Sequence, residues 1–243
     1  MSRVEHIAEG VTLYLGDCRE IIPTLGKVDA VVTDPPYGIG HVAKPNQTRA
    51  GSGLANPRVN AGRFSGSIIG DNIEFDPRPW LDWPCVFWGA NYYHTALPKN
   101  GQWLVWDKKC GAFSDWSSAD ADIAWCSVDG APRMFRMVWV GLVRGEIKKA
   151  NGGENAPSAH PNEKPVGLME WSIQKLKLPM SSLILDPYMG SGTTGIAAYK
   201  MNHRFIGIEA DPAHFETACE RISQEIRQGR LPFNGPSIMD AAE

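Results

Sequence analysis

The segment that decides the fold is residues 183–195, which read Leu-Ile-Leu-Asp-Pro-Tyr-Met-Gly-Ser-Gly-Thr-Thr-Gly. Its first three residues are aliphatic and predict a buried strand, the glycines predict a tight turn, and a helix is expected from about Thr193 to Met201. Phe205–Ile208 predicts a second strand, which Glu209 closes. A strand, a glycine-rich turn, a helix and another strand form the unit from which parallel α/β sheets are built.

The same turn carries a cofactor pattern. Gly190, Gly192 and Gly195 match G-x-G-x-x-G, in which glycines let the backbone approach a nucleotide or nucleoside. Glu209 follows Gly190 by 19 residues and stands where an acidic side chain accepts hydrogen bonds from ribose hydroxyls. We therefore predict a nucleoside-cofactor site, with a purely structural turn as the alternative. Because only about sixty residues lie from residue 183 onward, strands from earlier in the sequence must complete the sheet.

Six apolar stretches upstream supply those strands. They are Val11–Leu15, Val28–Thr33, Cys85–Trp88, Trp103–Trp106, Ile123–Cys126 and Phe135–Val140. Val28–Thr33 is almost continuously apolar, which is typical of a strand that is covered on both faces. Cys18–Leu25 predicts a short crossover helix that Pro23 limits. The chain is therefore expected to fold as α/β, with a mostly parallel, twisted, Rossmann-like sheet and helices on both faces.

A second motif follows the strand at Val28–Thr33. Asp34-Pro35-Pro36-Tyr37 places a carboxylate, two prolines and an aromatic ring directly after a buried strand. The prolines fix φ and remove two backbone donors, so the carbonyls and flanking side chains are held rigidly. Asp34 and the Pro35 carbonyl can then accept both N–H bonds of an exocyclic amine, while Tyr37 stacks on its ring. The motif predicts a site for a planar, amine-bearing molecule, with a capped turn and a core tyrosine as the alternative.

With these two motifs, the sequence resembles the S-adenosylmethionine-dependent DNA amino-methyltransferases. Asp34–Tyr37 is similar to their catalytic motif, and Leu185–Thr194 is similar to their cofactor motif. The order, catalytic motif first and cofactor motif late, resembles the circularly permuted β group of adenine-specific enzymes. Further stretches that agree are Leu15–Cys18, His160–Pro165, Phe87–Tyr93 and Trp106–Lys108, of which the last two are similar to phage-borne members. Tyr188 stands where Phe is usual, and Asn162-Glu163 stands where Thr-Gln is common.

The resemblance implies methyl transfer from S-adenosylmethionine to the N6 amine of an adenine that is flipped out of duplex DNA. The catalytic residues that it implies are Asp34, Pro35, Pro36 and Tyr37. The residues that it assigns to the cofactor are Asp17 on the adenine amine, the Cys18 backbone at the ring edge, Glu209 on the ribose, Lys164 near the carboxylate of the methionine part, and Asp186, Tyr188, Gly190, Ser191, Gly192 and Thr193 around that part. A solvated lysine is the alternative for Lys164, and no metal is implied.

Positive charge is concentrated in two segments. The chain has 24 basic and 27 acidic residues and a net charge of −3, yet residues 38–70 and residues 133–149 each carry +4. Such clusters suit phosphate binding, so duplex DNA is the expected partner. The basic residues expected to contact DNA are Lys44, Arg49, Arg58, Arg63, Arg133, Arg136, Arg144 and Lys148. A solvated basic surface is the alternative, and for Arg136, which lies in an apolar run, a buried structural pair.

Length and composition are those of one globular domain. The 243 residues are 43% hydrophobic and 21% charged, near the globular average. We expect a single methyltransferase domain over residues 1–243, with inserted DNA-recognition segments at about 38–75 and 107–160 and a flexible tail over 228–243. No apolar run approaches the ~18 residues of a membrane span, and the first residues lack an apolar signal region. We therefore expect a cytoplasmic protein without membrane contact.

Other functions fit part of the sequence. N4 methylation of cytosine uses the same amine chemistry and is the nearest alternative, followed by methylation of RNA or of a protein glutamine, a nicotinamide oxidoreductase and a non-catalytic DNA-binding module. Pro84-Cys85 resembles the nucleophile of cytosine C5 methyltransferases, but Cys85 begins an apolar stretch. The five cysteines form no Cys-x-x-Cys pair, so neither a disulfide framework nor a cysteine zinc site is predicted. A homodimer and a restriction endonuclease partner stay open.

Overall fold

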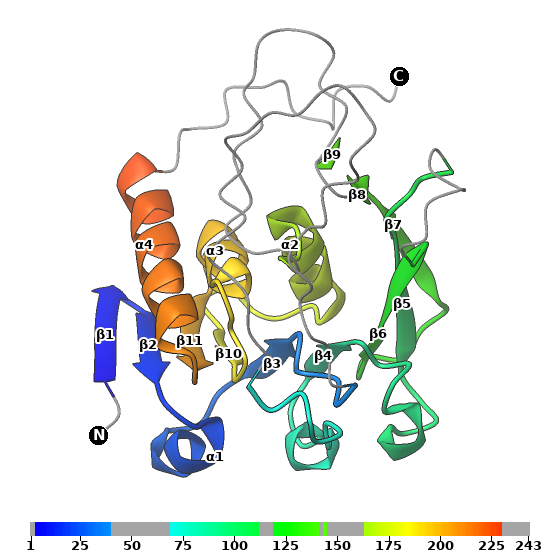
Figure 1. Cartoon of the computed structure of the whole chain (residues 1–243), viewed down its shortest axis with the longest axis horizontal. Helices are drawn as coiled ribbons and strands as arrows, with labels where there is room; N and C mark the ends of the chain where they lie inside the picture. Colours follow the sequence, from blue (N-terminus) through cyan, green and yellow to red (C-terminus); the bar gives the residue numbers. More distant parts are fainter. Residues whose placement is uncertain (1–2, 40–68, 112–118, 141–142, 145–162, 230–243) are drawn as a thin grey trace, which may run out of the picture.

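A nine-stranded sheet crosses the part of the chain that the computed structural model describes, which is residues 3–39, 69–111, 119–140, 143–144 and 163–229. The strands lie in the order β1-β2-β11-β10-β3-β4-β6-β5-β7 (Figure 1). Their bounds are β1 Arg3–Ala8, β2 Val11–Leu15, β3 Ala30–Thr33, β4 Cys85–Trp88, β5 Gln102–Asp107, β6 Ala121–Cys126, β7 Arg133–Arg136, β10 Leu183–Asp186 and β11 Arg204–Glu209. A small separate sheet pairs β8 (Trp139–Val140) with β9 (Val143–Arg144).

The centre of the sheet is parallel. β2, β11, β10, β3 and β4 run in one direction, whereas β1 is antiparallel to β2, and β6 is antiparallel to β4 and β5. β3 and β4 are buried along their whole length, which explains their unbroken apolar sequences. This arrangement confirms the mostly parallel α/β sheet that the sequence predicts.

Helices cover both faces of the sheet, but unequally. The long helices α2 (Val166–Lys175), α3 (Thr193–Lys200) and α4 (Pro212–Gln228) lie together on one face, where their buried side chains build the larger core (Figure 1). The other face carries the one-turn helix α1 (Cys18–Ile21) and the 3-10 turns η1 (Ile22–Thr24), η2 (Arg78–Trp80) and η3 (His94–Ala96). The smaller core under these turns is rich in aromatic rings: Phe75, Trp80, Phe87, Tyr93 and Trp125.

Three expected elements differ from the structure. The strand predicted from Val28 begins at Ala30, and Cys18–Leu25 divides into α1 and η1 because Pro23 cannot continue the α-helical hydrogen bonds. The single strand predicted over Phe135–Val140 is wrong, since β7 ends at Arg136 and β8 begins at Trp139. Between them the backbone N–H of Met137 donates to the Asp107 carbonyl at 3.3 Å, so the chain bends around the end of β5. The elements β1, α2 and α4 had no counterpart in our expectations.

The two segments expected as insertions are described only in part. Within 107–160, strands β6 and β7 belong to the main sheet. Within 38–75, Phe75 lies in the aromatic core, and Asp71 accepts a hydrogen bond from the Gly38 N–H at 2.9 Å. Residues 40–68, most of the second basic segment and residues 230–243 lie outside the described residues. No helix in the described ranges is both long and apolar enough to cross a membrane.

Candidate active site

The two sequence motifs meet at the carboxyl edge of the sheet. β10, which carries the glycine-rich turn, lies directly beside β3, which carries the Asp34 motif, although the two strands are far apart in the sequence. From β10 the chain continues to β11 on one side, while β4 lies on the other side of β3. Ligands of open α/β sheets bind at such a switch point, outside the carboxyl ends of the strands. A cavity of about 900 Å³ opens here, and both motifs line it.

The glycine-rich turn is held in place by Glu209 at the end of β11. The Gly190 N–H donates to Glu209 Oε2 at 2.8 Å, and the Asp211 N–H donates to Oε1 at 2.8 Å. Gly192 has a φ of 83°, and a Cβ there would lie 3.0 Å from the Ala218 side chain of α4, so the turn requires glycine. Burial raises the pKa of Glu209, although its backbone donors favour the ionised form. The carboxylate has lone pairs left for a ribose, which keeps its predicted role open.

Asp186, the last residue of β10, is a buried carboxyl group between the two motifs. Thr33 of β3 donates its hydroxyl to Asp186 Oδ1 at 2.7 Å, and the Tyr188 N–H donates to the same oxygen at 3.1 Å. Burial raises the pKa of Asp186 to about 7, despite these hydrogen bonds. A carboxyl group with such a pKa changes its charge near neutral pH, so a nearby cation would favour its ionised form.

Asp17 and Cys18, which follow β2, line the cavity at the carboxyl end of that strand. Asp17 caps α1 by accepting a hydrogen bond from the Arg19 N–H at 2.9 Å, and Arg19 Nη2 pairs with its carboxylate at 2.5 Å. The hydrogen bonds from Arg19 lower the pKa of Asp17. Burial raises the pKa of the Cys18 thiol, which fits a packing residue better than a nucleophile. The rings of Phe75, Trp80 and Tyr188 meet edge to face beside it.

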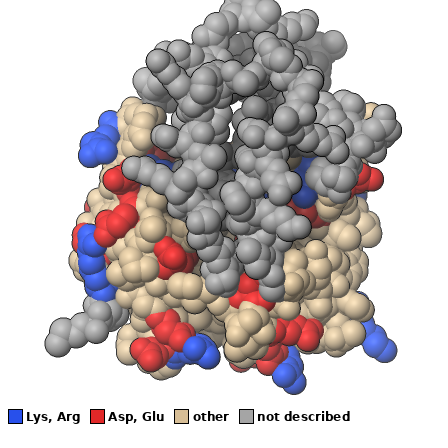
Figure 2. Space-filling model, viewed as in Figure 1, with Lys and Arg blue, Asp and Glu red and all other residues tan. Residues whose placement is uncertain are grey.

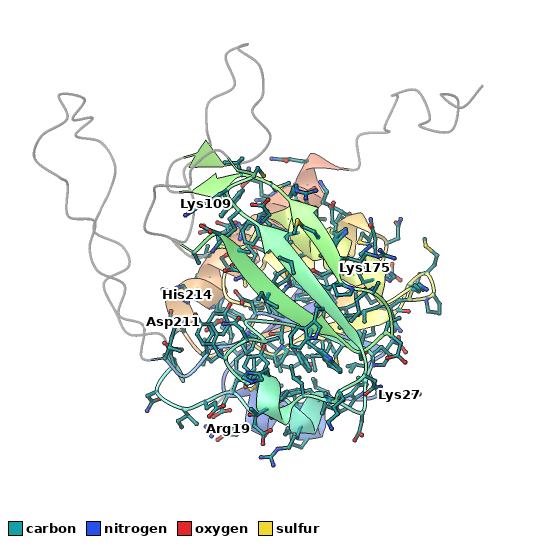
Figure 3. All side chains as sticks on the ribbon, turned by 90° about the vertical axis from the view of Figure 1, so that its right-hand side faces the viewer. Arg19, Lys27, Lys109, Lys175, Asp211 and His214 are labelled. Carbon is teal, nitrogen blue, oxygen red and sulfur yellow. The ribbon has the colours of Figure 1, made fainter. Side chains whose placement is uncertain are left out.

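Next to Asp17 and Cys18 lie the residues at the start of α4, because β11, which leads into α4, pairs with β2. Asp211 caps this helix through the N–H groups of Ala213 and His214, at 2.8 and 3.0 Å. Figure 3 shows Asp211 and His214 beside each other on this flank, with Arg19 further down. Asp211, His214 and Arg19 all line the cavity.

Both carboxylate oxygens of Asp34, the first residue of the tetrad, already accept hydrogen bonds. The Tyr37 hydroxyl donates to Oδ1, and Lys164 Nζ donates to Oδ2 at 2.8 Å. The Tyr37 ring stacks on Tyr92, with centroids 4.9 Å apart and an angle of 17° between the planes. Its edge lies so close to Gly89 that a Cβ there would be 2.0 Å from Tyr37 Cε1. Burial raises the pKa of Tyr37 well above its usual value, so the hydroxyl stays a donor.

Three residues that contact the tetrad, its partner Lys164 or one another at this edge were not among our predicted site residues. Asp122, at the start of β6, accepts a hydrogen bond from Lys108 Nζ at 2.8 Å and lies 3.5 Å from Lys164 Nζ. Tyr92 is the stacking partner of Tyr37. Lys108 and Tyr92 lie in stretches that carried the family resemblance, whereas the sequence shows Asp122 only as the second of two aspartates, after Asp120, that precede the predicted strand Ile123–Cys126. Lys164, expected on the cofactor, contacts Asp34 instead, and its cofactor contact stays a prediction.

Carboxyl groups dominate this cavity. In the described part of the chain, ten of them line it, with three lysine or arginine cations, Arg19, Lys108 and Lys164. The carboxyl groups are those of Asp17, Asp34, Asp71, Glu74, Asp76, Asp122, Glu163, Asp186, Glu209 and Asp211. On the face of the molecule that Figure 2 shows, acidic side chains lie across the middle and lower part, and lysines and arginines lie mostly at the margins. The cavity is therefore suited to a cationic ligand.

Few of the basic residues expected on DNA fall within the described structure. Arg133 and Arg136 are exposed on β7, and Arg136 Nε lies 3.7 Å from an Asp107 oxygen. The alternative of a buried structural pair for Arg136 is therefore wrong. The others lie outside the described residues or have side chains outside the description: Lys44, Arg49, Arg58, Arg63, Arg144 and Lys148.

Comparison with known proteins identifies the family of the chain. The family model N6_N4_Mtase, described as DNA methylase, matches residues 90–220, more than half of the chain, so the chain belongs to this DNA methylase family. Over 93 residues the chain is 34% identical to the Type II methyltransferase M2.DpnII of Streptococcus pneumoniae. That match covers 38% of this chain and 32% of the relative, so it spans about a third of the relative's length.

Two solved structures share the fold over most of the chain. The M1.HpyAVI–SAM complex has a TM-score of 0.51 and 22% sequence identity, and the match covers 87% of this chain and 99% of that one. The cytosine-N4-specific PvuII DNA methyltransferase also has a TM-score of 0.51, with 14% identity and coverage of 90% and 92%. At these identities the likeness concerns the fold alone.

Proposed function

We propose that this chain transfers a methyl group from S-adenosylmethionine to the exocyclic N6 amine of an adenine flipped out of duplex DNA. The observation that carries the proposal is the position of the Asp34 tetrad, held rigidly beside a glycine-rich cofactor turn in one cavity. The late position of that turn in the chain supports membership of the permuted β group. Membership of the DNA methylase family supports DNA as the substrate, and the S-adenosylmethionine in the M1.HpyAVI complex supports the cofactor.

The charge of the cavity separates this proposal from a nicotinamide oxidoreductase. S-adenosylmethionine carries a sulfonium, an ammonium and one carboxylate, and is a net cation, whereas a nicotinamide dinucleotide carries two phosphates. Ten carboxyl groups line the cavity, and even when Arg78 and Arg221, which pair with Asp76 and Glu163, are added to the three lining cations, the excess of negative charge would repel phosphates and favours the former. The residues present therefore fit S-adenosylmethionine: Glu209 would hold its ribose, and Asp186 with the turn after it would hold the methionine part.

The side chains of the tetrad prepare the amine for attack. S-adenosylmethionine, when bound, supplies an electrophilic methyl group. Asp34 and the Pro35 carbonyl accept the two N–H bonds of the amine, which draws its lone pair out of the aromatic ring. The nitrogen would gain its bond to the methyl carbon as that carbon loses its bond to sulfur, and the negative charge of Asp34 would stabilise the cationic nitrogen until its surplus proton passes to solvent. The rest of the rate enhancement comes from alignment of the two reactants in one cavity.

Tyr37 must change partners when the base enters. Its hydroxyl now donates to the Asp34 oxygen that is not held by Lys164. The amine of the target base then takes the place of the hydroxyl at this oxygen. The Tyr37 ring, which now stacks on Tyr92, stacks on the base at or close to its present position. The hydroxyl therefore keeps the half-buried carboxylate hydrogen-bonded until the substrate arrives.

Cytosine is the second candidate base. N4 methylation uses the same acceptor pair and the same amine chemistry, and the family covers both N6 and N4 enzymes. The likeness of the fold to the cytosine-N4-specific PvuII enzyme keeps this candidate open. The Asp at position 34 favours adenine, because the sequence resembles adenine enzymes at this position.

The proposal is tested by offering the purified chain two cofactors and three acceptors. Calorimetry should detect binding of S-adenosylmethionine and none of a nicotinamide dinucleotide. With a labelled methyl group, transfer should occur to duplex DNA and not to RNA or protein of the same total mass. Binding of the dinucleotide alone, or labelling of RNA or protein instead of DNA, would contradict the proposal.

Cofactor affinity should depend on pH through Asp186. Because the pKa of this carboxyl is about 7, it is mostly protonated at pH 6 and ionises as the pH rises. The positive charges of the cofactor favour the ionised form, so affinity should rise by about eightfold between pH 6 and pH 7.5. Calorimetry over this range measures the slope.

Asp186→Asn is the matched control for this pH dependence. It preserves the size of the side chain and cannot ionise, so the slope should largely disappear. A slope that persists in Asp186→Asn would assign the titration to another group, of which Glu209 is the foremost, since its pKa is also raised by burial.

Duplex binding should depend on salt through the two basic segments. Each phosphate contact contributes about −0.9 to the slope of log affinity against log salt. Replacing Arg49, Arg58 and Arg63 together with alanine should therefore flatten the slope, and so should the triple replacement of Arg133, Arg136 and Arg144.

The control for the salt series is the triple alanine variant of Lys27, Lys99 and Lys177. These lysines are exposed and precede β3, β5 and β10, so they lie at the opposite edge of the sheet. Their removal changes the net charge equally but should leave the slope as it is. If both arginine variants keep the parental slope, DNA is held by other residues.

A further inference from the structure

A chain of four alternating charges runs from Asp34 along the carboxyl edge of the sheet to Lys108 at the end of β5. Lys164 Nζ lies 2.8 Å from Asp34 Oδ2 and 3.5 Å from Asp122 Oδ2, and Lys108 Nζ lies 2.8 Å from Asp122 Oδ1. The four side chains come from the β3 edge, the segment before α2, the start of β6 and the end of β5. They are brought together because β6 runs antiparallel to β4, so its first residues reach the edge where the parallel strands end.

These charges are largely withdrawn from water. The side chain of Lys164 is 10% exposed, that of Asp122 is 24% exposed and that of Asp34 is 28% exposed. Burial alone would lower the pKa of Lys164, but the charge of Asp34 foremost, with those of its other neighbours, raises it well above its usual value. Burial would likewise raise the pKa of Asp122, but Lys164 and Lys108 hold it below its usual value. Lys164 therefore stays a cation and cannot take up the proton that the methylated amine releases.

The backbone around Lys164 is anchored on both sides of the cavity. The Glu163 carboxylate accepts a hydrogen bond from Arg221 of α4, which also donates to the Ser191 carbonyl at 2.6 Å. The Glu163 carbonyl accepts a hydrogen bond from Trp139 Nε1 at 2.9 Å. The backbone of Lys164 is thus held in place relative to the cofactor turn and β8. The direction of the Lys164 ammonium group then depends on its side-chain partners, among them Asp122.

We propose that Asp122 and Lys164 are positioning residues for methyl transfer and act in series on Asp34. This inference rests on the proposed function and deepens it. Asp122 holds the Lys164 ammonium group at the site, and Lys164 holds Asp34 Oδ2, which leaves Oδ1 turned towards the place where the Tyr37 hydroxyl now lies and where the amine enters. Neither residue touches the reacting atoms.

The cost of burying these charges supports a functional role. Taking ions out of water costs more than an ion pair commonly returns, so an apolar cluster of the same size would be at least as stable. β6 is otherwise apolar from Ile123 to Cys126, and an aliphatic residue at position 122 would fit its pattern. The carboxylate is explained if its task is to orient Lys164 and, through it, Asp34.

Four variants test the series: Lys164→Met, Lys164→Arg, Asp122→Asn and the double variant Lys164→Met/Asp122→Asn. Asp82→Asn is the control, since it removes one exposed carboxylate that does not line the cavity. Steady-state kinetics on duplex DNA give kcat and KM, calorimetry gives the affinity for S-adenosylmethionine, and circular dichroism monitors folding.

The expected pattern is specific to positioning. Lys164→Met and Asp122→Asn should each lower kcat by about 10- to 100-fold, the worth of a hydrogen bond to a charged group, with cofactor affinity within about twofold of the parent. Lys164→Arg should recover most of the loss because it restores the cation. The double variant should be no slower than Lys164→Met, since Asp122 acts only through Lys164. Asp82→Asn should match the parent.

Several results would overturn the inference. They are an unchanged kcat in Asp122→Asn, losses that multiply in the double variant, and a Lys164→Met variant whose main defect is cofactor affinity, which would make Lys164 a cofactor contact. If Lys164→Met does not fold, Asp122→Asn and Lys164→Arg still decide the matter, because both keep the size of a polar side chain. A parent chain that methylates no DNA overturns the proposed function, and this inference with it.

Discussion

Asp34→Ala should bind S-adenosylmethionine as tightly as the parent chain does and transfer its methyl group about 10²- to 10³-fold more slowly. The carboxylate lies at the β3 edge, where its contacts are the Tyr37 hydroxyl and Lys164 and not the glycine-rich turn. Its removal therefore takes away the acceptor and the negative charge that stabilise the cationic amine in the transition state. Single-turnover kinetics with saturating cofactor and DNA measure the chemical step directly.

Asp34→Asn separates the charge of Asp34 from its shape. The amide retains one acceptor oxygen in the same place but carries no charge, so it should recover little of the lost rate. Calorimetry with S-adenosylmethionine shows that each variant is folded and loaded. Turnover close to that of the parent in Asp34→Ala would remove Asp34 from the catalytic residues.

Gly89→Ala should lower the rate by about a hundredfold, the loss that a displacement of about 1 Å can cause in an active site. A Cβ at Gly89 would lie 2.0 Å from Tyr37 Cε1 and 2.4 Å from Cδ1, so the ring must leave its place. Because the Tyr37 hydroxyl is bonded to Asp34, the movement also disturbs the carboxylate. The three atoms nearest to such a Cβ all belong to Tyr37 and none to the cofactor turn, so affinity for S-adenosylmethionine should persist.

Gly229→Ala is the matched control for Gly89→Ala. Gly229 has a φ of 71°, close to the 75° of Gly89, but a Cβ there meets nothing within 4 Å. Both variants should share a loss of about 1–3 kcal/mol of stability from backbone strain at a positive φ, and Gly89→Ala should lose more because it also displaces the Tyr37 ring. Thermal unfolding measures that shared loss. If the two variants lose activity equally, the effect comes from backbone strain and not from Tyr37.

Those parts of the fold that depend on local sequence were predictable. β10, the turn and α3 were found from Leu183–Gly195, because aliphatic residues, glycines and a helix follow one another there in the order that a parallel unit requires. β4 was found with its bounds, because a strand buried on both faces is apolar throughout. The tetrad and the turn were predicted to act together, and the structure places them on neighbouring strands.

What depends on long-range pairing could not be predicted. The antiparallel placement of β6 brings Asp122 to Lys164, and nothing in the local sequence fixes that pairing. The bend at Met137 depends on the Asp107 carbonyl at the end of β5. Tyr92 meets Tyr37 only because Gly89 lets the two aromatic segments approach each other. For Lys164 the family resemblance implied a place near the cofactor, with a solvated lysine as the alternative, whereas its nearest partner, Asp34, comes from the other motif.

The identity of the methylated base tests the central claim most directly. Unmethylated genomic DNA is incubated with the chain and S-adenosylmethionine that carries an isotopically labelled methyl group, digested to nucleosides and analysed by mass spectrometry. The Asp34 tetrad and its acidic cofactor cavity predict labelled N6-methyldeoxyadenosine, which should vanish in Asp34→Ala. Labelled N4-methyldeoxycytidine as the main product, or label that is absent from every nucleoside, would contradict the claim.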